Sequence, residues 1–415
     1  MNAAETVFED KILSDASSVL AGPDLPPVVT RRAVLKGVGS AGLTVAVAAT
    51  GVLSYRAYDN GVLDPGSGRP YEAWLHWRDD PSPLGAVAAA ILAANPHNTQ
   101  PWTFRVTDTS IDLFSDPART MRHMDALDRE HQVGLGCALE NLVLATAARG
   151  YHSTVRLLPE AADPGHIAQV TLAQGSPGGS ELYDAIGDRH SNRGPYTAAP
   201  IAAQTLTRLT ALAADLPGVE IAWLTSVGQK RALGALLIDA TRAVIADKQQ
   251  SIEAFGWFRN NRDDINTHRD GLTLDGQGLD PFTLTLAKLL PAYTRAAGDQ
   301  FWLTQTETVH TATAAAYGII TVTDCANPSQ RLTGGRLLQR IHLAAARRGI
   351  GMQHMNQITE RIDRDTATGS ADVFDARYAG LLGQPGRSPL ATFRLGHPQR
   401  AARRSPRRAV MVVTG

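Results

Sequence analysis

The chain carries LENLVLATAARG at residues 139–150 and LQRIHLAAARRG at residues 338–349, and this pair of stretches decides the fold. They align without gaps and are identical at six of twelve positions. Each has apolar residues at helical spacing, ends at a glycine and follows a strand-like segment, at residues 111–114 in the first copy and 318–322 in the second. We interpret them as copies of one helix-and-strand unit, 199 residues apart. Chance similarity between two alanine-rich helices is the alternative.

A duplication of this kind gives a single chain the shape of a dimer, with a pseudo-two-fold axis between its halves. We expect an α+β fold of mixed or antiparallel sheets packed with helices, with an N-terminal half at residues 57–178 and a C-terminal half at residues 179–415. A ligand at the interface would be held by both halves, and the chain would be a monomer that mimics a dimer. The hydrophobic patterns also predict strands at 103–106, 155–158 and 167–172, helices at 83–94 and 134–150, and a final strand at 409–413.

The composition describes a folded chain without a general affinity for nucleic acid. Of 415 residues, 43% are hydrophobic and 19% are charged, and 40 Lys plus Arg balance 40 Asp plus Glu. This is too apolar for a disordered chain, and a single long uncharged run excludes a polytopic membrane protein. Zero net charge removes the counterion release that drives nucleic-acid binding. Cys137 and Cys325 are the only cysteines and no HExxH motif occurs, so we expect neither a disulfide framework nor a metal site.

The first 56 residues resemble an export signal. Arg31 and Arg32 precede an apolar pair and a lysine, and an uncharged run of moderate hydropathy extends from residue 37 to residue 55. This pattern resembles a twin-arginine (Tat) signal with a cleavage site at the AVA of residues 46–48, and the run is nearly long enough for an uncleaved membrane anchor. An ordinary amphipathic helix is the alternative. We expect export by the Tat translocase or membrane anchoring rather than a cytoplasmic location.

The segment NPHNTQPW, at residues 95–102, combines two prolines with side-chain amides. Pro96 and Pro101 restrict the backbone around the amides Asn98 and Gln100, which offer donors and acceptors in a defined geometry. Such an amide can bond the edge of a planar heterocycle. The phrase can equally be a rigid turn whose asparagine bonds its own backbone.

Two basic segments suit a phosphate group. RHSNR at residues 189–193 combines guanidinium groups with a hydroxyl, as phosphate binding requires, although Asp184 and Asp188 could pair with these arginines in a solvated turn. Near the end of the chain, QRAARRSPRR at residues 399–408 has five arginines and no acid. A basic C-terminal tail is often solvated. Here the apolar residues 409–413 that follow it are expected to pack against the protein and to hold the basic segment in place.

HNTQPWTF, RHSNR and the closing FRLGHP with RSPRR occur in an order that resembles the nitroreductase superfamily, flavoproteins that hold FMN at a dimer interface. The length and the duplication resemble its Acg-type branch, in which one chain replaces the dimer. The resemblance covers most of residues 70–415, and it implies one FMN per chain because the first half has no counterpart of RHSNR. The chain departs from the family at Ala94-Asn95-Pro96, where small residues and a serine are common.

The resemblance implies which residues bind the FMN. The phosphate and ribityl chain would be held by Arg189, His190, Ser191 and Arg193. From the C-terminal segment, Arg407 with Arg404 or Arg408 would also bind the phosphate. The flavin ring would be met from the other half by Pro96, His97 and Asn98. Its N5 and O4 edge would lie near His354, Asn356 and Gln357.

The implied activity passes hydride or electrons through FMN to nitro, quinone or related acceptors, with chemistry at the flavin N5 and no required side-chain acid or base. The donor would be NAD(P)H or, for an exported protein, a quinone or another membrane-associated compound. The alternative is a protein that stores or sequesters FMN without efficient turnover. Residues 251–291, with the aromatic Phe255, Trp257 and Phe258, could form a lid over the flavin, or they could be a surface insertion. A lid would block the access of NAD(P)H to the flavin, and this is the reason for the storage alternative.

Overall fold

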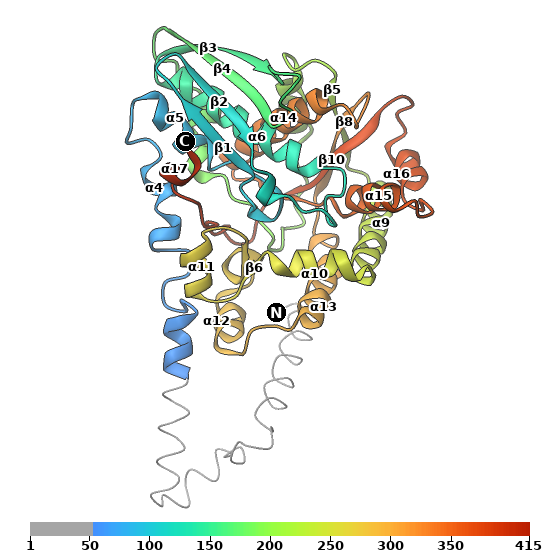
Figure 1. The fold of residues 1–415 in the computed structure, drawn as a ribbon. Coiled ribbons are helices and arrows are strands. Elements are labelled where there is room, and N and C mark those ends of the chain that lie inside the picture. The colour runs from blue at the N-terminus through green and yellow to red at the C-terminus, as the bar shows by residue number, and fades with distance from the viewer. Residues whose placement is uncertain (1–52) are drawn as a thin grey trace, which may run out of the picture.

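The computed structural model describes residues 53–415, so the twin-arginine motif and nearly all of the uncharged run that follows it lie outside the described residues. Across residues 53–415, none of the helices combines the length and the apolar character that crossing a bilayer demands. Two four-stranded sheets organise this part of the chain (Figure 1).

The first sheet consists of β1 (Trp102–Val106), β2 (Ser110–Ser115), β3 (Tyr151–Leu157) and β4 (His166–Gln174). The strand order is β1-β2-β4-β3 and every neighbouring pair is antiparallel. Helix α6 (Arg129–Ala148) connects β2 to β3. The predicted strands of the first half are therefore confirmed, each with ends shifted by a few residues.

The second sheet repeats this plan with β5 (Val219–Leu224), β8 (Ala316–Val322), β9 (Gly351–His354) and β10 (Ser388–Gly396). Its order is β5-β8-β10-β9, again antiparallel throughout, and helix α14 (Pro328–Arg347) connects β8 to β9. In both sheets the sequence order of the strands is first, second, fourth, third, with a helix of 20 residues between the second and the third. The expected α+β fold with two like halves is confirmed.

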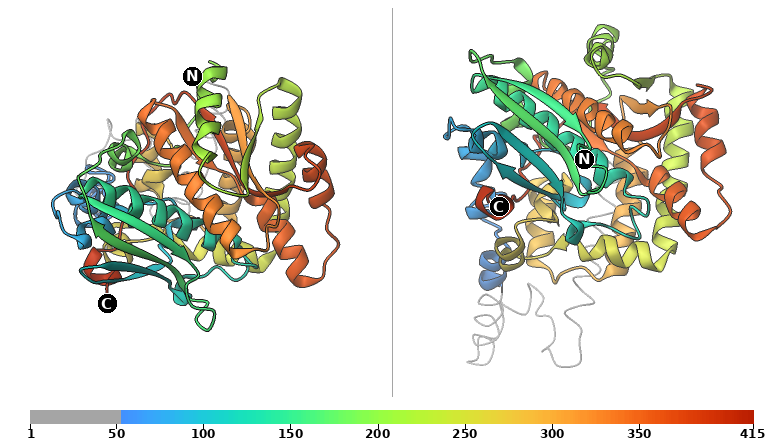
Figure 2. Two further views of the ribbon diagram at one scale, coloured as in Figure 1. Left: turned by 90° about the horizontal axis from the view of Figure 1, so that it is seen from above. Right: turned by 45° about the horizontal axis from the view of Figure 1, so that its top comes forward.

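Helices α6 and α14 pack against each other, each covering its own sheet (Figure 2). A Cβ on Gly136 would lie 2.1 Å from the carbonyl oxygen of Leu332, and a Cβ on Gly335 would lie 2.1 Å from that of Val133. Gly335 follows Gly136 by the same 199 residues that separate Leu332 from Val133. The contact is thus reciprocal, as at the isologous interface of a symmetric dimer.

Polar side chains join the same two helices. Glu140 of α6 accepts hydrogen bonds from Arg336 Nε at 2.7 Å and Arg340 Nε at 2.6 Å, and Gln339 Nε2 donates to Asn141 Oδ1 at 2.8 Å. Since Glu140 is buried, the two guanidinium groups supply the opposite charge that a buried carboxylate requires.

The chain between β5 and β8 forms a helical layer, shown in yellow and orange below the two sheets in Figure 1. It contains α9 (Val227–Ala246), α10 (Lys248–Gly256), β6 (Phe258–Arg259), α11 (Arg262–His268), β7 (Leu272–Thr273), α12 (Pro281–Leu289) and α13 (Arg295–Gln305). Residues 53–59 are helical and contact this layer, where Arg56 Nη1 donates to Leu289 O at 3.2 Å. The segment predicted as a lid, residues 251–291, forms the central part of this layer, from within α10 to the end of α12.

The remaining helices surround the sheets: α4 (Ala73–His76), α5 (Pro83–Ala90), α7 (Glu181–Asp184), α8 (Ala203–Thr210), α15 (Gln357–Thr368), α16 (Asp375–Leu382) and α17 (Val410–Val413). The strand predicted at residues 409–413 is wrong, because α17 is a single helical turn and only Thr414 makes a β-bridge, to Phe104 of β1. A short apolar run has no period that separates a helical turn from a strand. Backbone pairing with the edge strand β1 involves only Thr414 and Gly415, and Gly415 N donates to Phe104 O at 3.1 Å.

Candidate functional site

A cavity of about 230 Å³ lies where the two halves meet the helical layer. The first half contributes the loop at residues 94–97 and the N-terminal part of α6, and the second half contributes Ser191, Arg193 and residues 353–360. The helical layer closes the remaining side with an aromatic wall: Phe255, Phe258, Tyr293, Phe301 and Trp302. The cavity therefore combines aromatic side chains with polar groups, which suits an aromatic ligand that carries polar atoms.

The cavity gathers seven of the residues implied by the resemblance: Pro96, His97, Ser191, Arg193, His354, Asn356 and Gln357. The other six are not among its lining residues: Asn98, Arg189, His190, Arg404, Arg407 and Arg408. Folding thus brings RHSNR, the NPHNTQPW loop and the segment after α14 to one site, although several side chains of these motifs point elsewhere.

The NPHNTQPW loop has an unusual backbone. His97, Asn98 and Gln100 have φ values of 44°, 57° and 53°, in the left-handed region that side chains other than glycine and asparagine rarely adopt. Asn95 Oδ1 accepts from Gln100 N at 2.8 Å, so an asparagine of the loop does bond the loop's own backbone. This turn aims His97 at the cavity.

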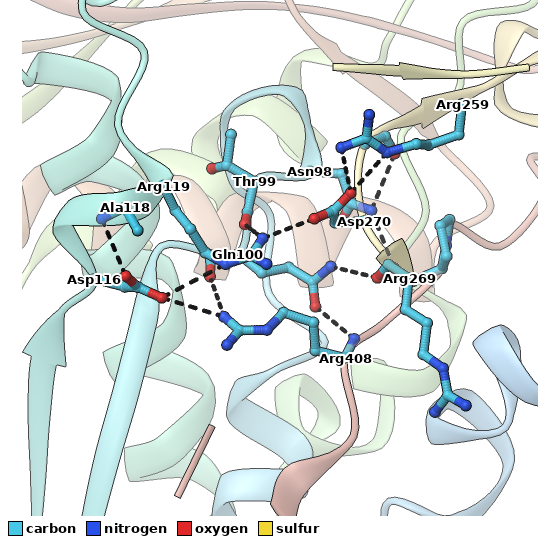
Figure 3. Close-up of polar contacts among 12 residues, drawn as sticks. Asn98, Thr99, Gln100, Asp116, Ala118, Arg119, Arg259, Arg269, Asp270 and Arg408 are labelled. Carbon is cyan, nitrogen blue, oxygen red and sulfur yellow. Dashed lines mark hydrogen bonds and ion pairs between the residues drawn. The ribbon is translucent and has the colours of Figure 1, made fainter. Parts of the chain in front are cut away.

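Asn98 is fully occupied by protein groups. Its Nδ2 donates to Gly271 O at 3.1 Å and to Pro406 O at 3.0 Å, and its Oδ1 accepts from Arg407 Nη1 at 2.6 Å. Gln100 acts similarly: its Nε2 donates to Arg269 O at 2.8 Å and its Oε1 accepts from the Arg408 backbone at 2.8 Å (Figure 3). These amides join the helical layer and the C-terminal segment to the loop.

Two carboxylates reinforce this junction (Figure 3). Asp270 forms ion pairs with Arg119 at 2.8 Å and with Arg259 at 2.7 Å, and Asp116 contacts Arg119 and Arg408, each at 3.5 Å. The C-terminal Arg408 is therefore committed to the loop junction.

Arg189 and Arg407 lie buried together beside Trp74, with guanidinium carbons 5.7 Å and 4.8 Å from its ring centroid. Both donate to Leu92 O, at 2.9 Å and 3.4 Å, and Arg407 also donates to Ala93 O at 3.2 Å. These carbonyls follow α5, so the arginines satisfy groups at the end of that helix. Burial lowers the pKa of Arg189 to about 10. Among residues 53–415, neither Arg189 nor Arg407 forms an ion pair with a carboxylate. Their positive charge is left uncompensated close to the cavity.

Arg193 supplies a buried cation within the cavity itself. Its Nη1 donates to Gly276 O at 3.1 Å, and burial lowers its pKa to about 10. Gly278, with φ 73°, fits so closely here that a Cβ on it would lie 2.2 Å from Gly194 N. The helical layer is thereby held against the RHSNR segment.

Several histidines around the cavity are neutral because they are buried near arginines. Burial, assisted by Arg193, lowers the pKa of His97 to about 4, and burial with Arg189 and Arg193 lowers that of His354 to about 3. Burial with Arg189, Arg407 and Arg404 lowers the pKa of His190 to about 3. A ligand anion on this side of the cavity would meet the positive charge of Arg193 beside neutral imidazole rings.

His342, beneath His354, leads to a prediction about acid stability. Its Nδ1 lies 3.4 Å from Arg189 Nη1 and its Nε2 lies 3.3 Å from His190 O, so it accepts at one nitrogen and donates at the other, as a neutral ring does. Burial lowers its pKa well below 6.5, whereas the unfolded chain protonates this ring below about pH 6.5. The unfolded state then binds more protons, and the free energy of unfolding falls as the pH drops below 6.5.

We expect His342→Gln to reduce that pH dependence by up to about 1.4 kcal/mol per pH unit below pH 6.5. Urea unfolding followed by circular dichroism across this range measures it. His152→Gln, on an exposed strand position, is the control and should leave the slope unchanged. Equal slopes in wild type and His342→Gln would contradict the neutral assignment.

Several cavity residues belong to no motif that could be recognised in the sequence. Tyr293, Phe301 and Trp302 lie in the helical layer beyond the predicted lid, and Glu130 and Glu360 lie in the first turns of α6 and α15. A glutamate in the first turn of a helix is an ordinary terminal residue, and only the tertiary structure brings these two to one cavity.

Fold and cavity together define a class of protein: a single α+β chain whose two like halves enclose one aromatic and cationic cavity at their interface. No protein-family model matches the chain. The protein named "Putative NAD(P)H nitroreductase Rv3131" of Mycobacterium tuberculosis strain H37Rv is 30% identical over 162 residues, 39% of this chain and 47% of that protein. The "Putative NAD(P)H nitroreductase acg" of the same strain is 32% identical over 133 residues, 30% of this chain and 40% of that protein. The chain thus spans about half the length of the curated relatives it matches.

Among solved structures, the NADPH:FMN oxidoreductase of Vibrio harveyi, complexed with NAD⁺, is similar with a TM-score of 0.33 and 15% identity over 57% of this chain and 76% of that one. A nitroreductase with bound FMN from Desulfitobacterium hafniense gives a TM-score of 0.32 and 15% identity over 55% of this chain and 94% of that one. The sequence similarity is therefore to two proteins named as putative NAD(P)H nitroreductases, over 39% and 30% of this chain.

Proposed function

We propose that this protein is an FMN-binding oxidoreductase of the nitroreductase type, with one FMN in the cavity between its halves. The observation that carries the proposal is the polar lining of the cavity. His354 Nε2 and Gln357 Oε1 are buried and have no hydrogen-bond partner among residues 53–415, although both residues line the cavity. Unpartnered buried donors and acceptors of this kind are costly unless a ligand satisfies them.

The charge distribution fits the phosphate of FMN. Arg193 and Ser191 would hold that group, with the uncompensated charge of Arg189 and Arg407 behind them. His354, Asn356 and Gln357 would meet polar atoms of the ring, and His97 with Pro96 would line its side. The aromatic wall matches an isoalloxazine face. When bound, FMN would supply two-electron transfer between a reductant and an acceptor.

The acceptors proposed are nitro compounds, quinones and related molecules, and the donor is NAD(P)H or a quinone-type compound. This rests on the printed names of the relatives and on the size and aromatic lining of the cavity. The chain's own residues would bind and orient the partners and exclude water from the cavity.

Arg193→Ala tests the cofactor site. Loss of a buried charge-assisted contact to phosphate is expected to weaken FMN binding roughly 10- to 100-fold, since such hydrogen bonds contribute about 1.5–3 kcal/mol. Flavin content of the purified protein and titration of the flavin-free protein with FMN measure the effect. Arg347→Ala, an exposed position at the end of α14, is the matched control. Undiminished FMN affinity in Arg193→Ala would show that the phosphate lies elsewhere.

The alternative function, storage or sequestration of FMN, has support in the helical layer. Residues 251–291 line the cavity through Phe255, Phe258, Leu272, Leu274 and Gln277, so a bound flavin would lie beneath them. Mixing the loaded protein with NADH or NADPH in a stopped-flow instrument separates the two functions. Bleaching of the flavin absorbance supports the oxidoreductase, and no bleaching with either donor supports storage.

Export by the Tat translocase, with or without membrane anchoring, stays part of the proposal on the strength of Arg31 and Arg32. Fractionation of cells that express the wild type or Arg31→Lys/Arg32→Lys tests it. A cytosolic location of both proteins would overturn it.

The proposal also holds that the chain is a monomer, because its two sheets and the α6–α14 contact already reproduce a dimer interface.

A further inference from the structure

Two glutamates from opposite halves meet at the cavity. Glu130 lies in the first turn of α6 and Glu360 lies in the first turn of α15, and both line the cavity beside Asn356 and Gln357. Their carboxyl groups are within hydrogen-bonding reach of each other. They share the cavity with the groups proposed to meet the flavin ring.

No lysine, arginine or histidine of residues 53–415 forms an ion pair with either glutamate. Glu130 Oε1 and Glu360 Oε2 are buried and have no donor among residues 53–415. The other charged groups that act on the pair are the acids Asp125 and Asp363, which raise the pKa values of the glutamates. Two carboxylates packed together without a cation cannot both stay ionised, so a proton must bridge them.

The nearby arginines are engaged elsewhere. Arg129 Nε donates to Asp363 Oδ2 at 2.7 Å and its Nη1 donates to Pro389 O at 2.7 Å. Arg331 Nη1 donates to Leu127 O at 2.6 Å, and Arg331 Nε donates to Cys325 O at 2.5 Å. The hydrogen bonds given for both guanidinium groups therefore go to groups other than the two glutamates.

The pKa shifts agree with this geometry. Burial raises the pKa of Glu130 well above its ordinary value, and the adjacent Glu360 raises it further, opposed by a hydrogen bond from Asn356. Burial also raises the pKa of Glu360 to about 8, with Asp125 and Asp363 contributing and the bond to Glu130 opposing. Burial and Glu130 raise the pKa of Asp125 to about 8 as well. The N-terminal ends of two helices favour one remaining negative charge on the pair.

We propose that Glu130 and Glu360 form a proton-sharing carboxyl pair that donates the proton consumed when a quinone is reduced in the cavity. This inference rests on the proposed function, which supplies the hydride from a reduced nicotinamide. A quinone that accepts a hydride becomes a hydroquinone monoanion. The carboxyl O–H bond of the pair then breaks as the second O–H bond of the hydroquinone forms, and the two carboxylates left behind recover one proton from water.

The first test reads the protonation of the pair without any turnover. Infrared spectroscopy of the purified protein at neutral pH should show the carbonyl stretch of a protonated carboxyl group, shifted in D₂O. The band should lose intensity in Glu130→Gln/Glu360→Gln, with any remainder assigned to Asp125, whose pKa is also raised. It should keep its full intensity in Glu220→Gln, whose carboxylate is exposed beside Arg387. An identical band in the double variant, or none in the wild type, would overturn the shared proton.

A second readout uses stability. The folded pair retains a proton that the unfolded chain has released by about pH 6.5, so unfolding free energy falls as the pH rises from about 6.5 to 8. Glu360→Gln should flatten this fall, whereas Glu220→Gln should not change it. The comparison removes the contribution of histidines to the slope, because Glu360→Gln and Glu220→Gln leave every histidine in place.

The third readout separates proton donation from the proposed function itself. With menadione as the quinone, Glu130→Gln and Glu360→Gln should each lower the turnover number roughly 10²-fold, as loss of a general acid does, and should change its pH profile. FMN content and the rate of flavin bleaching by NAD(P)H should stay near wild type. Unchanged menadione turnover would overturn the donor role alone. Absence of FMN from the wild type, or of bleaching, would overturn the proposed function and with it the donor role, while the infrared band still reports the pair.

Discussion

Gly136→Ala is expected to lower the free energy of unfolding by about 3 kcal/mol or more, because the new methyl group has no space in a backbone-to-backbone contact. Its Cβ would lie 2.1 Å from Leu332 O and 2.9 Å from the carbonyl carbon, and neither atom can move without shifting α14. Urea unfolding at constant pH measures the loss. Gly335→Ala should behave alike, since a Cβ there meets Val133 O at the same 2.1 Å.

The control is Gly380→Ala, which lies within α16 with nothing within 4 Å of the added Cβ. Alanine is favoured over glycine in a helix by about 1 kcal/mol, so this variant should be slightly more stable than wild type. The double variant Gly136→Ala/Gly335→Ala should lose less than the sum of the single losses, since one separation of α6 from α14 relieves both clashes. If Gly136→Ala were as stable as Gly380→Ala, the reciprocal contact between the halves would be wrong.

Asp363→Ala is expected to destabilise the protein by about 3–5 kcal/mol, because it leaves the Arg129 guanidinium buried without its counter-charge. Arg129 Nε donates to Asp363 Oδ2 at 2.7 Å and a second bond joins Arg129 Nη2 to Asp363 Oδ1, a bidentate pair between α6 and α15. Both residues are buried. Burial lowers the pKa of Arg129, but the bonds to Asp363 outweigh it and raise that pKa overall.

Two further variants separate the charge effect from lost packing. Arg129→Leu/Asp363→Leu removes both charges and should recover part of the stability, as apolar replacements of buried pairs often do. Asp239→Ala breaks an exposed pair with Arg377, 2.8 Å long, and should cost less than about 1 kcal/mol. Equal losses in Asp363→Ala and Asp239→Ala, measured by urea unfolding, would mean that the buried pair does not hold the halves together.

The fold was largely predictable, because its main elements are long or strictly patterned. The helix of residues 134–150 and its copy have apolar periodicity over several turns, and α6 and α14 were found where expected. The strands of the first sheet alternate clearly and were also found. The run of residues 409–413 was mispredicted because one turn has too few residues to show a period.

The candidate site was predictable only in outline. RHSNR and NPHNTQPW reach one cavity, yet Asn98 is committed to Gly271, Pro406 and Arg407, and Arg189 bonds Leu92 O. A motif specifies which side chains are available. The direction of each side chain depends on which backbone carbonyl groups lie close to it after folding. No local sequence pattern predicts those neighbours.

By itself, the sequence determined the two-half α+β plan and the resemblance to flavin-binding nitroreductases, because a repeated helix and ordered motifs are properties of a linear chain. The tertiary structure alone decided which charges the cavity contains. Arg193 enters it from one segment, Glu130 from α6 and Glu360 from α15, and their pKa values depend on burial and on one another. Electrostatic interactions act through space over a few ångströms, so residues far apart in the chain set each other's protonation only once folding has placed them together.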